Sequence, residues 1–353
     1  MALLALLAVP LSLLLHYVIH APAPWVFGLS AVALGILADW TRRATEQLAE
    51  RAGPAVGGLI SISLGSVAEI ILALFVLLDG QAEVVRAQLT GSIMGTTLLG
   101  LGLAILAGGL GRDKQVFDRE RVGLLSTLLM LATVALLLPA TFDLTARSVV
   151  HNNHVGLSDE QLSLGVSAIL LALYGGNLIY TLVTHRDVFA SSDERGQPTW
   201  SLGKTIAVLV AATAMVAWEA EIVSDALTEA ASALNFSPTF LGVVVLALVG
   251  TGGDLLAAVT FARQDKMSLV LNIAIGSAIQ IALVVAPLLV LVSWLMGHPM
   301  TLVFSNPLQL FAIAGTAFIV RAVAADGETT WFEGLLLVGV YALLALGFFF
   351  VEG

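Results

Sequence analysis

The chain contains no cysteine, and only 11% of its 353 residues are charged. Without cysteine there are no disulfide bonds, no thiol chemistry and no thiolate metal sites. The shortage of charge, together with an apolar content of 58%, excludes an ordinary soluble domain of this length. The chain also lacks a basic, aromatic-interleaved segment of the kind that binds nucleic acid. The composition therefore predicts a protein that is buried mostly in a lipid bilayer.

The few charges that are present are mainly negative, because 25 acidic residues stand against 15 basic ones. Several of these acids lie inside apolar runs rather than in the loops. An unpaired carboxylate at the centre of a bilayer costs roughly 2.5 kcal/mol or more. Acids retained at such positions indicate a function that involves cations.

Apolar runs of membrane-spanning length follow one another almost from end to end. A bilayer core of ~30 Å requires roughly 20 apolar residues per helix. Cutting the chain at charged, proline-bearing or glycine-bearing gaps predicts eleven spans: 2–20, 24–39, 55–78, 83–110, 121–140, 162–185, 202–231, 238–263, 268–297, 304–321 and 331–351. The first run has no Lys or Arg before it, so we expect a retained helix, with a cleaved signal peptide as the alternative.

The basic residues are distributed unevenly over this layout. Thirteen Lys and Arg fall on one side, and only Arg86 and Arg147 fall on the other. By the positive-inside rule the first side is cytoplasmic. This predicts an integral protein of a prokaryotic inner membrane, with its N-terminus in the cytoplasm and its C-terminus outside. Asp39, Glu46 and Glu50 stand among the arginines of the first cytoplasmic segment, where we expect local ion pairs.

The chain also repeats itself weakly at a distance of 185 residues. Identical pairs in this register are Gly57 and Gly242, Gly65 and Gly250, Ala73 and Ala258, Val85 and Val270, Gly91 and Gly276, Ser92 and Ser277, Leu98 and Leu283, and Leu103 and Leu288. Five spans separate the copies, so the copies enter the membrane in opposite senses, as in many secondary transporters. We therefore expect an all-α membrane protein with a leading helix at 1–23, a first five-helix repeat at 24–185, a cytoplasmic linker at 186–201 and a second five-helix repeat at 202–353.

Glu69 and Asp254 coincide in the same register, each just after a glycine and a hydroxyl residue. Gly65 and Ser66 precede Glu69, and Gly250 and Thr251 precede Asp254. Carboxylates, hydroxyls and freed backbone carbonyls form an all-oxygen ligand set, which suits Ca²⁺, Mg²⁺, Mn²⁺ or Na⁺ rather than soft metals. The alternative is that each acid is protonated or paired within a helix interface.

Two further groups of polar residues accompany the acids. Ser92, Thr96, Ser277 and Gln280 follow on the next helix of each repeat, and they would either line the same cavity or serve in ordinary small-residue packing. Glu219, Glu221, Asp225 and Glu229 lie within the span at 202–231, and the last three share one helical face. They would form either a gate or cation funnel or a solvated helix end.

Two carboxylates in one apolar site repel each other, so the site will hold protons or a cation and seldom neither. Binding of a cation then competes with protonation at a single site. Competition at one site is antiport.

These residues resemble the two signature regions of the calcium/proton exchanger family, within the cation/Ca²⁺ exchanger superfamily. The likeness covers roughly residues 40–350 and includes Trp218-Glu219-Ala220-Glu221 and Gly276-Ser277-Ala278-Ile279-Gln280. The resemblance implies that Glu69 and Asp254 bind Ca²⁺ and protons alternately. It also implies that the first helix and the helix at 202–231 slide to switch access.

The chain departs from the family pattern within the motifs themselves. The family's Gly-Asn-x-x-Glu has Ser66 and Thr251 at the Asn positions, and Asp254 at the second Glu position. The resemblance implies Ca²⁺/H⁺ exchange without a resident cofactor, with protons and an inorganic cation as the transported partners, whereas the substituted motif residues favour another cation. Proton antiport of Na⁺, K⁺, Mn²⁺ or Mg²⁺ and a non-transporting membrane scaffold are the alternatives. The sequence leaves homo-oligomer formation open.

Overall fold

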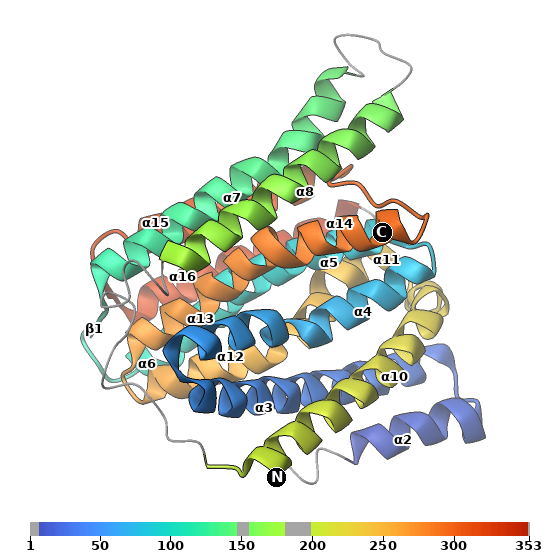
Figure 1. The fold of residues 1–353 in the computed structure, drawn as a ribbon, viewed down its shortest axis with the longest axis horizontal. Coiled ribbons are helices and arrows are strands. Elements are labelled where there is room, and N and C mark those ends of the chain that lie inside the picture. Colours follow the sequence, from blue (N-terminus) through green and yellow to red (C-terminus); the bar gives the residue numbers. More distant parts are fainter. Residues whose placement is uncertain (1–6, 147–154, 181–198, 352–353) are drawn as a thin grey trace.

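The computed structural model describes residues 7–146, 155–180 and 199–351, and these are overwhelmingly helical (Figure 1). Eight of the described helices are long and apolar enough to cross a membrane, and three shorter apolar helices accompany them. The prediction of an all-α membrane protein with about eleven spanning helices is confirmed. The linker predicted at 186–201 and the exact repeat boundaries stay predictions, because residues 181–198 lie outside the described part.

The helices of the N-terminal half include short π-helical stretches, labelled η. In order they are α2 (Ala8–Leu14) with η1 (Leu15–Ile19), α3 (Ala23–Gly65), α4 (Val67–Leu78), α5 (Ala82–Met94) with η2 (Gly95–Gly100) and α6 (Leu101–Gly109), α7 (Arg119–Thr145) and α8 (Val155–Ile179). The C-terminal half contains α10 (Leu202–Leu234), α11 (Pro238–Phe240) with η5 (Leu241–Leu246) and α12 (Ala247–Arg263), α13 (Met267–Gln280) with η6 (Ile281–Val285) and α14 (Ala286–Leu295), α15 (Pro307–Val323) and α16 (Trp331–Val351).

The separation of spans 24–39 and 55–78 by a loop is wrong, because α3 remains helical across residues 40–54. The helix is nevertheless not one straight rod, and Figure 1 shows it folding back on itself. A Cβ placed on Gly57 would come 2.2 Å from the carbonyl oxygen of Ala49, although eight residues span roughly 12 Å in a straight helix. Gly53 and Pro54 lie between these positions, and proline cannot complete the helical hydrogen-bond ladder. The helix therefore consists of two antiparallel legs, a first leg at Ala23–Ala52 and a second leg at residues 57–65.

The two halves share local geometry in the register that the sequence predicts. After α4, Gly80 and Gln81 donate backbone hydrogen bonds to Leu77 and Val76, and after α12, Asp265 and Lys266 donate to Ala262 and Phe261. Gly80 and Asp265 both have positive φ, at 76° and 63°. The π-helices η2 and η6 also fall at corresponding places. The repeat detected in the sequence is therefore also present in the structure.

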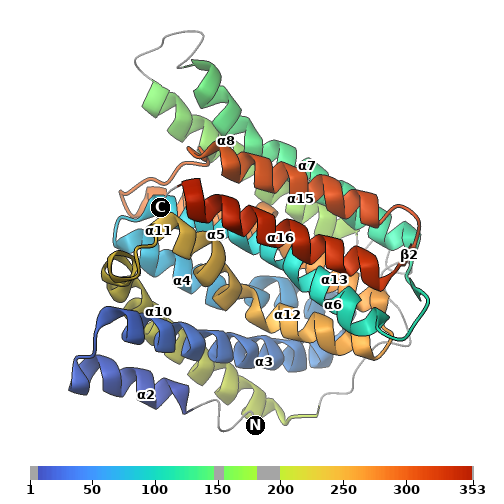
Figure 2. The same ribbon diagram turned by 180° about the vertical axis from the view of Figure 1, so that it is seen from behind.

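An outer helix of each half packs against a helix of the other half. In the view of Figure 2, α16 from the C-terminal half lies beside α6 of the N-terminal half, and α8 correspondingly packs on α14. Each half thus covers the other, as a twofold relation between inverted repeats requires. The first leg of α3 packs along α10 and also contacts α12. A Cβ added to Gly35 in this leg would lie 3.7 Å from the carbonyl oxygen of Val249 in α12.

Two smaller features differ from the predicted layout. Strands β1 (Gln115–Val116) and β2 (Glu328–Thr329) form a short antiparallel ladder between two connections. Beside it Lys114 forms an ion pair of 2.6 Å with Glu328, and this hydrogen bond raises the pKa of the lysine. Helix α8 starts at Val155, before the predicted span at 162–185, because the polar residues that precede the apolar run are also helical.

Candidate cation site

Glu69 stands at the start of a half-helix. The chain leaves helical geometry at Ser66, and α4 begins at the next residue, so Glu69 lies in its first turn. The side chain is only 3% exposed. The N-terminus of a helix carries a partial positive charge, which favours a carboxylate at this position. The break at Ser66 therefore places a buried acid in the first turn of a helix.

Asp254 stands on α12, where glycines permit close approach of the neighbouring helices. A Cβ on Gly250 would lie 3.4 Å from Cγ of Glu69, and one on Gly253 would lie 3.3 Å from Cα of Asp39. These contacts bring α12 against both α4 and the first leg of α3. Unlike the first-repeat helix, α12 continues through its motif without a break. The sequence predicted that broken helices free backbone groups at the site. The structure contains such a break only in the first repeat, at Ser66.

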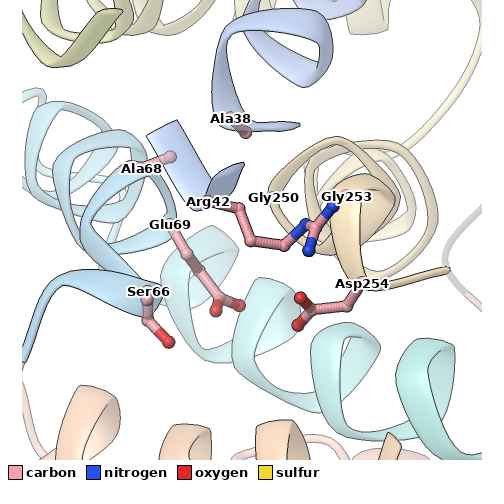
Figure 3. A pocket seen from close by; sticks show the side chains of 9 residues that line it. Ala38, Arg42, Ser66, Ala68, Glu69, Gly250, Gly253 and Asp254 are labelled. Carbon is pink, nitrogen blue, oxygen red and sulfur yellow. The ribbon is translucent and has the colours of Figure 1, made fainter. Parts of the chain in front are cut away.

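The two acids share one pocket, shown in Figure 3. The pocket is small, with a cavity volume of about 10 Å³, roughly the room for one water molecule, and it is lined by Ala38, Arg42, Gly65, Ser66, Ala68, Glu69, Gly250, Gly253 and Asp254. The carboxylates of Glu69 and Asp254 point toward each other across it. Residues 185 positions apart in the sequence therefore meet at one site.

A serine from the following helix of the same repeat lies beside each acid. Ser92 interacts electrostatically with Glu69, and Ser277 interacts in the same way with Asp254. These serines correspond in the repeat, so the site contains two copies of one acid–serine unit. Oε1 of Glu69 and the Ser92 hydroxyl are buried, and neither has a hydrogen-bond partner of good geometry within the described residues. Buried polar atoms without partners are costly, which is typical of a site that binds an ion or water.

The other predicted lining residues surround this pair less directly. The Thr251 hydroxyl donates to the Ala247 carbonyl at 2.8 Å, and the Thr96 hydroxyl donates to that of Ser92 at 2.9 Å. Thr96 and Asp254 also line a second small pocket. The Gln280 amide lies near Gly65, with its nitrogen 3.6 Å from an added Cβ. Of the predicted lining residues, Gly65, Ser66 and Gly250 line the pocket, and the others are not among the residues that line it.

The acidic residues of α10 are not among the residues that line the pocket. Glu219 is fully buried elsewhere, where it accepts a hydrogen bond of 2.5 Å from Ser12 and interacts with Ser30. Glu221, Asp225 and Glu229 are exposed. Glu219 therefore belongs to the contact of α10 with α2 and α3, and it is separate from the exposed face that the sequence suggested as a funnel.

Arg42 is the charged residue of this pocket that sequence reasoning missed. Its spacing from Asp39 and Glu46 predicted local ion pairs, and the structure contains both of them. The same side chain also lines the pocket, and it interacts electrostatically with Asp254. Helical continuity through residues 40–54, which the predicted loop concealed, is what places it there.

Within the described residues, no three side chains of His, Cys, Asp or Glu gather to hold a metal ion. A cation in this pocket would therefore be bound by two carboxylates supplemented by hydroxyl and backbone oxygens. Inverted helical repeats that each contribute one intramembrane acid to a shared pocket define a secondary transporter of cations.

Comparison with known proteins gives the family. The model of the family described as sodium/calcium exchanger protein matches residues 22–183 and 204–350, and the chain belongs to this family. It is 35% identical to the "Ca(2+)/H(+) antiporter" of Aphanothece halophytica, covering 98% of this chain and 95% of the relative. It is 37% identical to the "Ca(2+)/H(+) antiporter ChaA" of Bacillus subtilis (strain 168), covering 97% and 96%.

Solved structures agree with this assignment. The structure of native YfkE matches with a TM-score of 0.84 at 33% identity, over 99% of both chains. The H⁺/Ca²⁺ exchanger CAX matches with a TM-score of 0.71 over 99% of this chain, and at 17% identity that likeness bears on the fold alone.

Proposed function

We propose that this protein exchanges Ca²⁺ for protons across a membrane, and that Glu69 and Asp254 bind the two in turn. The observation that carries the proposal is the pair of repeat-related acids facing each other in one pocket, each beside a repeat-related serine. The names of the curated relatives, which are Ca(2+)/H(+) antiporters, support the choice of ions.

Electrostatics supplies the coupling between the two ions. Two carboxylates in a site of low dielectric repel each other strongly. A divalent cation cancels both charges, and so do two protons, but the cation and the protons cannot occupy the same carboxylates at once. If the unloaded pair is too costly to carry between the two faces of the membrane, only the cation-loaded and the protonated forms complete the cycle. Uncoupled leak is then suppressed.

The ligand chemistry suits Ca²⁺ because every candidate donor is oxygen. Ca²⁺ accepts carboxylate, hydroxyl, carbonyl and water oxygens at about 2.3–2.6 Å in flexible geometry. The Asp254 carboxylate is one methylene shorter than the family's Glu, and the partly exposed position of Asp254 leaves room for water to complete the shell. Mg²⁺, Mn²⁺, Na⁺ and K⁺ are the competitors that a direct measurement must include.

Access to the site would alternate through the elements at its edge. The resemblance assigned sliding to the first helix and to the helix now seen as α10. The first leg of α3, rather than α2, occupies the place in the N-terminal half that α10 occupies in the C-terminal half, and these two helices pack along each other. We therefore assign the movement to α3 and α10. The excess of Lys and Arg on one side supports a cytoplasmic N-terminus and an extracytoplasmic C-terminus in a prokaryotic inner membrane.

Purified protein in a weak buffer near neutral pH should release protons when Ca²⁺ is added, because the cation displaces them from the shared site. The release should saturate with Ca²⁺ and be much smaller with equal concentrations of Mg²⁺, Na⁺ or K⁺. A pH indicator and a parallel titration of each salt measure it. Saturable release with another cation but not with Ca²⁺ would assign a different substrate, and release with none would contradict proton-coupled exchange.

A further inference from the structure

Arg42 places a fixed positive charge in the wall of the exchange pocket. Its side chain is 16% exposed, and Figure 3 shows it extending from the first leg of α3 to the side of the pocket that holds Gly253 and Asp254. Because of Arg42, the charged groups that line the pocket are two carboxylates and one guanidinium. With both acids ionised, the lining carries a net charge of −1 rather than −2.

Local partners satisfy Arg42 only in part. Its terminal nitrogens contact Asp39, at 3.0 Å, and Glu46, while its Nε is buried and has no hydrogen-bond partner within the described residues. Asp39 is also shared, since its second oxygen pairs with Nε of Arg43 at 2.7 Å. Glu46 is about half exposed, so water screens that pair. Part of the Arg42 charge therefore acts on the pocket, where Asp254 is its electrostatic partner.

A fixed charge affects a divalent ion more than a monovalent one. Coulomb repulsion scales with the charge of the incoming ion, and it is much stronger inside the protein than in water. While no cation is bound, the same guanidinium stabilises the ionised Asp254. A transported ion must also bind weakly enough to leave again. A built-in positive charge achieves this without removing any ligand.

We propose that Arg42 is an internal counter-cation of the exchange pocket, which balances Asp254 in the empty site and lowers the affinity for a divalent cation so that the cation can be released. The inference rests on the proposed function, because it takes Glu69 and Asp254 as the cation ligands. It makes Arg42 a determinant of affinity and of the preference between divalent and monovalent ions.

The test measures the Ca²⁺ dissociation constant of the full-length protein by titration calorimetry in detergent. Arg42→Gln, and Arg42→Met as a second neutral variant, should each lower the Kd for Ca²⁺ by about tenfold or more. Arg42→Lys keeps the charge, so its Kd should stay within about threefold of the original protein. The KM of Ca²⁺ exchange in vesicles should fall in parallel for the two neutral variants.

Arg43→Gln is the matched control. It removes the same charge from the adjacent position and also deprives Asp39 of a partner, but Arg43 is half exposed and is not among the pocket-lining residues. Its Kd should change by less than about twofold, because water screens its charge. The counter-cation proposal is overturned if the Kd for Ca²⁺ is unchanged or higher in both neutral Arg42 variants. It is also overturned if Arg43→Gln lowers the Kd as much as the Arg42 variants do. Either result leaves the proposed function intact. Failure of the original protein and all the variants to bind any of Ca²⁺, Mn²⁺, Na⁺ and K⁺ would refute both.

Discussion

Replacing Glu69 with Gln should reduce Ca²⁺/H⁺ exchange to about 1% of the original activity or less, which corresponds to a loss of at least about 2.7 kcal/mol. The substitution keeps the shape of the side chain and removes half of the charge that balances a divalent ion. Oε1 of Glu69 has no hydrogen-bond partner within the described residues, so the substitution breaks no hydrogen bond at that oxygen. Asp254→Asn should have a similar effect. Ca²⁺ uptake into everted vesicles driven by an imposed pH gradient measures both.

The matched control is Asp113→Asn, which neutralises an exposed acid in the connection after α6 and should leave uptake unchanged. Immunoblotting of the same vesicles establishes that each variant reaches the membrane. If Glu69→Gln and Asp254→Asn both exchange at normal rates while present in normal amounts, neither residue is a ligand, and the exposed acids of α10 become the candidates.

The second large effect is expected at Gly91, where α5 meets η5 at the centre of the bundle. A Cβ at this position would lie 1.9 Å from the carbonyl oxygen of Val243 and 2.7 Å from Cβ of Ala247. Both helices contact each other through backbone here, so neither can yield by rotating a flexible side chain. Gly91→Ala should destabilise the protein by about 3 kcal/mol, at the upper end of ordinary overpacking.

Gly276, the repeat counterpart of Gly91, provides the control. A Cβ on Gly276 would meet nothing within 4 Å. Gly276→Ala should leave stability unchanged or raise it slightly, because alanine is the better helix former. The temperature at which the detergent-purified variants lose their monodisperse elution profile compares the two. Equal behaviour of the two substitutions would mean that the close approach of α5 and η5 is not a rigid feature of the fold.

The acids of the site could be predicted because an intramembrane carboxylate is conspicuous in an apolar sequence. Their coincidence in the 185-residue register singled out Glu69 and Asp254, and the same register paired them with Ser92 and Ser277. The structure brings the two acids into one pocket and places the corresponding serine beside each acid. Such a pattern can be recognised in the sequence because it depends only on residue type and on the spacing between residues.

Other features depend on packing and could not be predicted in this way. Arg42 had a satisfactory local interpretation, and only the helical course of α3 and its contact with α12 place it at the pocket. The asymmetry between Gly91 and Gly276 was equally hidden, because identical letters in the repeat suggest identical environments. The helix break at Ser66 without an equivalent break in α12 shows that the repeat preserves the positions of the acids more faithfully than the backbone around them.

The most direct test of the central claim is the location of Ca²⁺ in crystals soaked at neutral and at acidic pH, measured by long-wavelength anomalous diffraction. The account predicts a peak at neutral pH within about 2.3–2.6 Å of carboxylate oxygens from both Glu69 and Asp254. It predicts that this peak disappears at acidic pH, because protons occupy the same oxygens. A peak that lies elsewhere, or one between these acids that persists unchanged in acid, would contradict competition at a single shared site.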